Sequence, residues 1–223
     1  MDISRYRVFI FDVNGVLFLS NEGNARALAA AFTTDEAVQR RIVDLYAVMS
    51  GLDRGTKIRR VQEEVIGCPF QEGEFELRWE RFKELSRDSM LMAPLGRGCR
   101  EVLESLGKAG KVRAALSNTP PAQLAEVLKR RGLDTLLDIV RGGGDWPKTQ
   151  SLARMLDECG LSASDCLFLA DGRGDLAAAR GSGVDFAGIN EVADEFEGAS
   201  DILGRWPDLG AWGEEHLGIT LGA

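Results

Sequence analysis

The sequence lacks several features that would assign a protein to a specialised class. It has no run of about 18 apolar residues, the length that a membrane-spanning helix requires. Its first residues, MDISRYR, lead into an apolar stretch without the pattern of a secretory signal. We therefore predict a cytoplasmic protein that does not insert into a membrane.

Cysteine and histidine are scarce. The four cysteines are far apart and form no CxxC pair, so the sequence suggests neither a zinc site nor a disulfide framework. His216 is the only histidine, and we interpret it as a solvated residue of a C-terminal tail, because histidine catalysis needs organised partners. The cysteines are Cys68, Cys99, Cys159 and Cys166.

Positive charge is also in short supply. The chain has 27 Lys and Arg against 35 Asp and Glu, a formal net charge of -8. Binding to nucleic acid relies on clustered basic residues, so this balance argues against a broad nucleic-acid surface but is compatible with a local pocket for a small anion. With 223 residues, of which 44% are hydrophobic, the chain can form one sizeable domain or a core domain with a smaller insert.

Short apolar segments predict strands, and helical patterns lie between them. The first three segments do not alternate between apolar and polar residues, which is typical of strands buried on both faces in a parallel sheet. Strands that alternate with helices predict an α/β doubly wound fold. The expected strands are 7–11, 112–116, 167–170 and 184–189, and the expected helices are 98–109, 121–131, 149–159 and 174–180.

Residues 24–90 break this alternation. The segment is almost entirely helical in pattern and highly charged, with DEAVQRRIVDLYAVM and EFELRWERFKEL as its clearest amphipathic pieces. It leaves just after the first strand and returns before MAPLGRG, where a proline and glycines indicate a hinge-like turn. We predict an α/β core domain of residues 1–20 and 91–223 and an inserted helical cap of residues 21–90.

Polar side chains follow the predicted strands at their carboxyl ends. Asp12 follows the first strand, Ser117 and Asn118 follow the second, and Asp171 follows the third. Lys148 lies in the loop GGGDWPKTQ between the second and third strands. Any one of these residues could be an ordinary cap or turn residue, but ligands of open α/β sheets bind at this edge. Together they predict a functional site.

Four motifs occur in the order and approximate spacing of those of the haloacid dehalogenase-like (HAD) hydrolase superfamily, which the chain resembles from about residue 7 to residue 209. The motifs are FDVNGVL, LSNTP, the loop around Lys148 and LADGRGDLAAARGSG. The insert resembles the C1 cap of the phosphoglycolate phosphatase and β-phosphoglucomutase branch, and ASDILGRWPDL looks like that branch's last strand and the start of the next helix. The resemblance implies a Rossmannoid parallel-sheet core with an inserted helical cap. The third motif is looser, since Pro147 precedes Lys148, whereas the family often places a proline after its lysine.

The resemblance implies roles for the residues at the strand ends. Asp12 would be the nucleophile that forms an aspartyl-phosphate. Asp12, the backbone carbonyl of Asn14 and Asp171 match the family's Mg²⁺ ligands, with Asp175 near them. The retained Asp171 and Asp175 argue against the metal-free 2-haloacid dehalogenases and favour Mg²⁺.

Further residues would contact the substrate, which the resemblance implies is a small phosphorylated metabolite. Ser117 would hydrogen-bond a phosphoryl oxygen, and the adjacent Asn118 is a second candidate contact. Lys148 would neutralise the charge on the nucleophile and the phosphoryl group. Gly15 would let the chain turn sharply under the site.

Asn14 departs from the family pattern. Family phosphatases have a second aspartate here, which protonates the leaving oxygen and then activates water, and asparagine can do neither. Such acid–base catalysis contributes about 10²- to 10⁴-fold in rate, so turnover of ordinary phosphate monoesters should be slow. Three explanations stay open: a hydrolase of low activity or with a good leaving group, C–P bond cleavage like that of phosphonoacetaldehyde hydrolase, or a catalytically inactive binding or regulatory protein.

The segment MSGLDRGTKIRRV is the best candidate for the part of the cap that reaches the cleft. Arg54, Lys57, Arg59 and Arg60 offer anion-binding charge, and we expect Arg54 to contact the substrate; solvated basic residues at a helix start are the alternative. Lys57 lies where a cap lysine could form an imine, although a solvated lysine is the more ordinary interpretation. The amphipathic cap helices can face the core or a second subunit, so the sequence allows a monomer or a homodimer.

Overall fold

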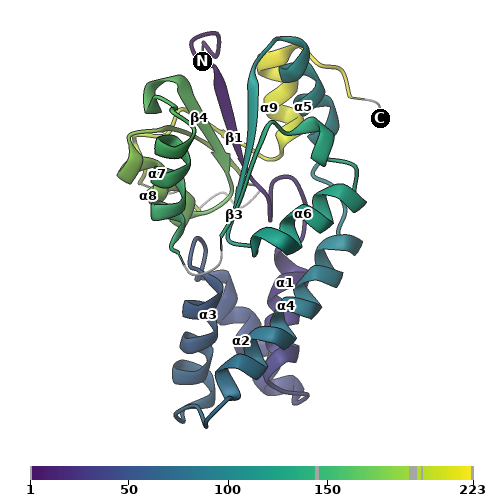
Figure 1. Ribbon diagram of the computed structural model, residues 1–223, viewed down its shortest axis with the longest axis vertical. Helices are drawn as coiled ribbons and strands as arrows, with labels where there is room; N and C mark the ends of the chain where they lie inside the picture. The colour runs from purple at the N-terminus through teal and green to yellow at the C-terminus, as the bar shows by residue number, and fades with distance from the viewer. Residues whose placement is uncertain (1, 144–145, 191–194, 197, 222–223) are drawn as a thin grey trace.

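The computed structural model describes residues 2–143, 146–190, 195–196 and 198–221 (Figure 1). Within these residues six strands form one sheet in the order β3-β2-β1-β4-β5-β6, and every neighbouring pair is parallel. This order places β1 and β4 side by side at the centre, where the strand order reverses. The strands are β1 (Val8–Asp12), β2 (Val112–Ser117), β3 (Ile139–Gly142), β4 (Cys166–Ala170), β5 (Asp185–Ile189) and β6 (Arg205–Trp206).

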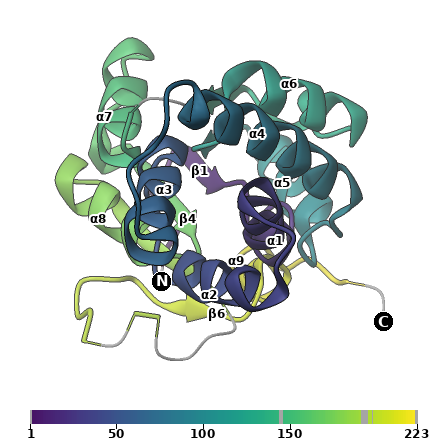
Figure 2. The same ribbon diagram turned by 90° about the horizontal axis from the view of Figure 1, so that it is seen from below.

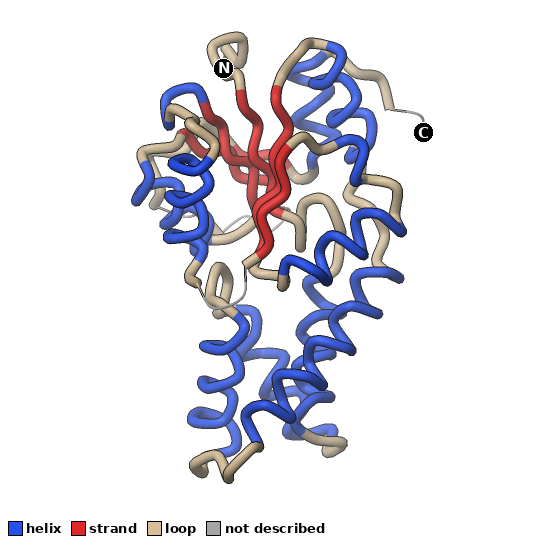
Figure 3. The backbone as a smooth tube through the Cα atoms, viewed as in Figure 1, coloured by secondary structure: helices blue, strands red, loops and turns tan. Residues whose placement is uncertain are grey.

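Helices cover both faces of the sheet, which explains why β1 is apolar without alternation. Phe9 and Phe11 pack into the hydrophobic cluster on one face, and Val8 and Ile10 pack into the cluster on the other. Figure 3 shows the sheet between these two layers of helices. One layer holds α5 (Cys99–Lys108), α6 (Pro121–Arg130) and α9 (Leu209–Leu217), and the other holds α7 (Lys148–Glu158) and α8 (Arg173–Ser182).

A group of helices with its own hydrophobic core projects from the carboxyl edge of the sheet (Figures 1 and 2). We call this group the cap. Asp35 caps its second helix by accepting from the backbone N–H groups of Ala37 and Val38, and Asp53 caps the third by accepting from Thr56. The cap comprises α1 (Asn21–Phe32), α2 (Glu36–Ala47), α3 (Arg54–Val61), a π-helical turn (Gln62–Ile66) and α4 (Glu74–Met92).

The α/β fold and its parallel sheet are confirmed, and each predicted helix and strand is found within one or two residues of its expected ends. The strand β3 was not predicted, because its four residues IVRG lie at the sheet edge and are only partly buried. Domain boundaries at residues 20/21 and 90/91 stay a prediction. None of the helices in the described part of the chain is both long and apolar enough to cross a bilayer.

The prediction for His216 is wrong. His216 belongs to α9, and its side chain is 5% exposed rather than solvated. Its ring packs against Trp206 at 5.1 Å and Trp212 at 5.4 Å between centroids. The sequence GAWGEEHL contains two glycines and two acids, so its helical pattern is weak. It nevertheless forms a short helix whose apolar side packs into the core.

Candidate functional site

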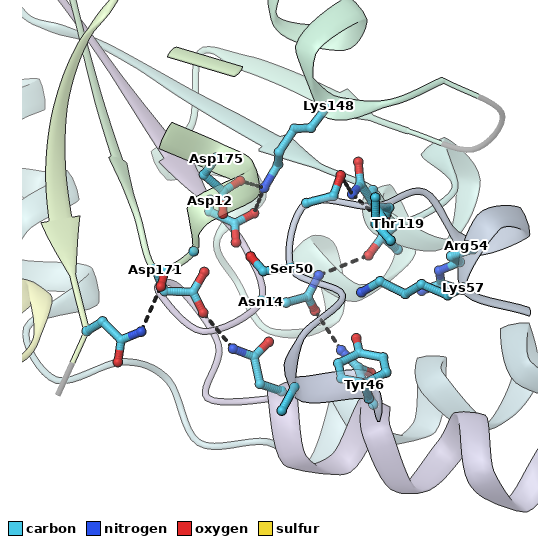
Figure 4. A pocket seen from close by; sticks show the side chains of 18 of the residues that line it. Asp12, Asn14, Tyr46, Ser50, Arg54, Lys57, Thr119, Lys148, Asp171 and Asp175 are labelled. Atoms are coloured by element: carbon cyan, nitrogen blue, oxygen red, sulfur yellow. Dashed lines mark hydrogen bonds and ion pairs between the residues drawn. The ribbon is translucent and has the colours of Figure 1, made fainter. Parts of the chain in front are cut away.

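The sheet brings the predicted polar residues together at its carboxyl edge. Asp12 is the last residue of β1, Ser117 is the last residue of β2, and Asp171 directly follows β4. Parallel pairing aligns Asp12 with Leu116, so the ends of β1 and β2 lie level. A cavity of about 350 Å³ lies between this edge and the cap (Figure 4). Its lining includes Asp12, Asn14, Asn21, Asn24, Tyr46, Ser50, Gly51, Arg54, Lys57, Asn118, Thr119, Lys148, Asp171, Asp175 and Glu195.

Three carboxylates and one ammonium group occupy the floor of this cavity. One ligand oxygen each from Asp12, Asp171 and Asp175 lies within 4.8 Å of the other two. Lys148 starts α7, and its Nζ lies 2.5 Å from Oδ1 of Asp12 and also forms an ion pair with Asp175. Asp12, Asp175 and Lys148 are all buried, so these charges interact with little screening by water.

The carboxylates are crowded beyond what one lysine can neutralise. Burial raises the pKa of Asp171 well above its ordinary value, and the charges of Asp12 and Asp175 raise it further. Burial likewise raises the pKa of Asp175 to about 6, although Lys148 opposes this change. Burial alone would lower the pKa of Lys148, but Asp12 and Asp175 outweigh it and raise that pKa. A divalent cation bound by these oxygens would relieve the repulsion, and carboxylate oxygens are the donors that Mg²⁺ prefers.

Asn14 is held by hydrogen bonds at both ends of its amide. Nδ2 donates to the hydroxyl oxygens of Ser117 and Thr119, both at 3.3 Å. Oδ1 accepts from Ser20 Oγ at 2.8 Å and from Asn24 Nδ2 at 3.0 Å. All four partners are neutral, so the side chain is fixed and satisfied without offering an ionisable group to the cavity.

Ser117 lies one layer below the cavity surface rather than on it. Its side chain is fully buried, and its hydroxyl accepts from the backbone N–H of Thr119 and donates to the Thr119 hydroxyl. Thr119 lines the cavity instead. The contact of Ser117 with a phosphoryl oxygen stays a prediction, and Thr119 of the same motif LSNTP is a cavity-lining residue that was not predicted.

Gly15 makes the expected sharp turn, with φ of +100°. A Cβ at this position would lie 2.0 Å from Oδ2 of Asp171 and 2.5 Å from Nδ2 of Asn21. Asn21 donates to the same Asp171 oxygen at 2.6 Å, and Asn190 donates to the Asp171 backbone carbonyl at 2.7 Å. These two asparagines fix Asp171 from two sides, and they were not predicted because no motif contains them.

Two cap cations reach the cavity and two do not. Arg54 is 6% exposed and Lys57 is 9% exposed, so the interpretation of both as solvated residues is wrong. The Lys57 Nζ lies 4.1 Å from the centroid of the Tyr46 ring, and Figure 4 shows both cations at the cavity. Arg59 instead lies over the Phe75 ring, and Arg60 pairs with Glu64 within the cap.

Asn118 joins the core to the cap. Its Nδ2 donates to the backbone carbonyls of Gly51 at 3.1 Å and Leu52 at 2.9 Å. Its Oδ1 is buried without a hydrogen-bond partner among the described residues, and Asn118 lines the cavity. A substrate contact through this oxygen stays a prediction. The amide nitrogen already donates to the cap loop.

This fold and this site define a class: proteins with a parallel α/β core that carries an acidic centre at the carboxyl edge of its sheet, under an inserted helical cap. The family model of the haloacid dehalogenase-like hydrolases matches residues 6–183. The chain therefore belongs to the haloacid dehalogenase-like hydrolase family.

Individual relatives agree with this assignment. Protein CbbY of Cupriavidus necator is 26% identical over 97% of this chain and 99% of its own. A phosphoglycolate phosphatase of Pectobacterium atrosepticum is 31% identical over 49% of this chain, and the match spans about half of that relative, 51%.

Among solved structures, a predicted phosphatase from Clostridium acetobutylicum has a TM-score of 0.76 at 15% identity, with 96% of this chain and 99% of that chain covered. CbbY from Rhodobacter sphaeroides in complex with phosphate has a TM-score of 0.75 at 18% identity, with 93% and 96% covered. At these identities the structures show a shared fold.

Proposed function

We propose that the protein is a Mg²⁺-dependent phosphatase that hydrolyses a small phosphorylated metabolite through an aspartyl-phosphate on Asp12. The observation that supports this proposal best is the buried arrangement of Asp12, Lys148, Asp171 and Asp175 at the carboxyl end of the sheet. The curated relatives named phosphoglycolate phosphatase are in agreement with it.

The residues divide the chemistry between them. A carboxylate oxygen of Asp12 attacks phosphorus while the bond from phosphorus to the leaving oxygen breaks, and water then releases phosphate from Asp12. Lys148 holds Asp12 in place and neutralises charge on the phosphoryl group. Mg²⁺, held by Asp12, Asp171, Asp175 and the backbone carbonyl of Asn14, would supply further positive charge at the phosphoryl oxygens.

Asn14 limits the rate of both half-reactions. Its amide can neither protonate the leaving oxygen nor take a proton from the attacking water, and its four hydrogen bonds hold it in a neutral network. The activity should therefore be low on alkyl phosphates and higher on substrates whose leaving group needs no proton, such as acyl phosphates.

The cap side of the cavity favours a substrate with more than one anionic group. Arg54 and Lys57 both line the cavity, and no described carboxylate lies within 4.0 Å of either side-chain cation. Phosphoglycolate, which carries a phosphoryl group and a carboxylate, is therefore the first metabolite to test. We further propose that neither nucleic acid nor a membrane takes part, and a monomer and a homodimer both remain compatible with the proposal.

The test is Mg²⁺-dependent phosphate release from phosphoglycolate, acetyl phosphate and p-nitrophenyl phosphate. Release that disappears in Asp12→Asn and in the presence of a chelator supports the proposal. Release that survives Asp12→Asn would show that another group is the nucleophile, and absence of release from all three substrates would favour a binding role.

A second candidate function is cleavage of a C–P bond, and the burial of Lys57 at the cavity favours it. A lysine amine at this place could form an imine with an aldehyde substrate. Treatment with phosphonoacetaldehyde and borohydride would trap that imine as a stable adduct on Lys57. Absence of the adduct, with Lys57→Arg as the control, would rule this function out.

A further inference from the structure

Arg54 belongs to the cap, but a residue of the core holds its side chain. Its Nη1 donates to Oε1 of Gln123 on α6 at 3.1 Å, and both side chains are 6% exposed. The guanidinium also lies over the ring of Phe82, 5.0 Å from its centroid. Gln123 is not among the residues that line the cavity, so it would act on a ligand through the residues that it holds, and of these Arg54 lines the cavity.

A second hydrogen bond determines which end of the Gln123 amide faces Arg54. The Ser86 hydroxyl on α4 donates its single proton to the backbone carbonyl of Lys83 at 3.1 Å. It can therefore only accept from Gln123, whose Nε2 lies 3.3 Å away. The NH₂ end of the amide faces Ser86, and the carbonyl end faces Arg54. One core residue thus touches two cap helices.

None of these contacts neutralises Arg54. Within the described ranges, no carboxylate oxygen lies within 4.0 Å of its guanidinium, and its acceptor is a neutral amide. Burial lowers the pKa of Arg54 to about 10, which reflects the cost of keeping this charge away from water. An unpaired buried charge is unfavourable, and Arg54 lines the cavity, so a ligand can supply the missing negative charge.

We infer that Gln123 is a positioning residue that orients Arg54 toward a second anionic group of the substrate. Because Gln123 is neutral, it does not reduce the positive charge with which Arg54 binds that group. The group is a carboxylate or a second phosphoryl group. This inference rests on the proposed function, in which the first phosphoryl group reacts at Asp12. A glutamate at position 123 has the same size as glutamine and could keep the contact with Arg54. Its negative charge would neutralise the Arg54 guanidinium, so the substrate with a second anionic group would bind less tightly.

The test compares the affinity of three probes for the wild-type protein and for Gln123→Glu. Phosphoglycolate carries a carboxylate as its second group, ethane-1,2-diyl bisphosphate carries a phosphoryl group, and phenyl phosphate carries no second anion. Dissociation constants are measured by isothermal titration calorimetry with Ca²⁺ in place of Mg²⁺ to suppress turnover. Gln71→Glu adds the same charge at an exposed cap position away from the cavity and serves as the matched control.

We expect the wild-type protein to bind at least one two-anion probe about tenfold or more tightly than phenyl phosphate. In Gln123→Glu the same ratio of dissociation constants should fall to about threefold or less. Phenyl phosphate should change by less than about twofold, and Gln71→Glu should match the wild type. The probe that loses affinity identifies the second group as a carboxylate or a phosphoryl group. Gln123→Ala removes the acceptor without adding charge, so it should weaken the preference by about threefold and keep its direction.

Two results would overturn the inference. One is a wild-type protein with no preference for either two-anion probe. The other is a Gln123→Glu or Gln123→Ala protein that is folded by circular dichroism and weakens all three probes equally, which would indicate a merely structural role. If Gln123→Glu weakens the preference for two-anion probes but the wild-type protein releases no phosphate, the proposed phosphatase function is wrong. The role of Gln123 in anion binding would still be supported.

Discussion

Gly51 of the cap and Gly174 of the core lie backbone against backbone. A Cβ on Gly51 would lie 2.4 Å from the Cα of Gly174, and a Cβ on Gly174 would lie 2.4 Å from the Cα of Gly51. Asn118 holds the same cap loop from another side through its bonds to the carbonyls of Gly51 and Leu52. Glycine at both positions therefore lets the cap loop close directly over the acidic centre.

Gly174→Ala should push the cap loop away from the core. The new methyl group meets backbone, which cannot rotate aside, so we expect the KM of the metabolite to rise about tenfold as closure weakens. Gly181→Ala is the control, because it lies on the same helix and its Cβ would meet nothing within 4 Å. That control should keep full activity and gain about 0.5 to 1 kcal/mol of stability. Equal kinetic losses in both variants would contradict this account of the closure.

Lys148→Met should destabilise the protein because it leaves the buried carboxylates of Asp12 and Asp175 without their counter-charge. We expect the free energy of unfolding, measured with urea in the presence of a chelator, to fall by about 3 to 5 kcal/mol. Mg²⁺ should restore part of the loss, since in the proposed function it would bind the same oxygens. Lys129→Met, at an exposed position on α6, should change stability by less than about 0.5 kcal/mol. A Lys148→Met protein as stable as this control would show that the carboxylates are not held charged by Lys148.

The sequence carried enough information for the fold and for the acidic centre because both depend on local patterns. Strands buried on both faces, such as β1, are apolar up to their carboxyl ends. In a parallel sheet the polar residues at these ends lie at one edge, and this does not depend on the conformation of the loops. The sequence therefore predicts that four residues lie together, and the structure confirms their proximity: Asp12, Lys148, Asp171 and Asp175.

Contacts between the cap and the core could not be predicted in the same way. Gln123, Asn21 and Thr119 act through neighbours that are distant in the chain, and no spacing rule connects them. Gly174 lies within the fourth motif, but only the structure shows that the cap loop packs against its backbone at Gly51. The burial of His216 could not be predicted for a related reason, because it depends on Trp206 of β6 as well as on Trp212, which lies one turn earlier in α9.

His216 should make stability depend on pH. Burial lowers the pKa of His216 below its ordinary value of 6.5, although Glu215 opposes the shift. Below that ordinary value the unfolded chain binds a proton that the folded protein resists, so this contribution is present above pH 6.5 and is lost as pH falls through the folded pKa. One proton limits the slope to about 1.4 kcal/mol per pH unit.

The contribution of His216 can be isolated by comparing the wild-type protein with His216→Gln. Urea unfolding at several pH values below about 7 should show that the difference in stability between them changes in favour of the variant as pH falls. The subtraction removes the contributions of the carboxylates. Because His216 is the only histidine, its pKa can also be read directly from the NMR signal of its ring. A value above 6.5 would contradict the predicted sign.

Gly15→Ala should disturb the proposed Mg²⁺ site. A Cβ here would lie 2.0 Å from Oδ2 of Asp171, and φ of +100° strains any other residue. Asp171 must then leave the position in which Asn21 holds it, so we expect the affinity for Mg²⁺, measured by calorimetry without substrate, to fall about tenfold or more. The Gly181→Ala protein should bind Mg²⁺ as the wild type does. Unchanged affinity in Gly15→Ala would show that Asp171 is not a ligand.

Asn14→Asp should increase phosphate release by about 10²- to 10⁴-fold on alkyl phosphates, because it supplies a proton donor and acceptor at the leaving oxygen. The local network can accept the change: Ser20 and Asn24 already donate to one end of the side chain, and the hydroxyls of Ser117 and Thr119 can turn to donate to the other. The gain should be much smaller on acetyl phosphate in the first half-reaction, since its leaving group needs no proton. The measurement is phosphate release in single-turnover and steady-state experiments, with the double variant Asp12→Asn and Asn14→Asp as the inactive control. An Asn14→Asp protein no faster than the wild type would mean that another residue already performs the acid–base steps, or that the site does not transfer phosphoryl groups.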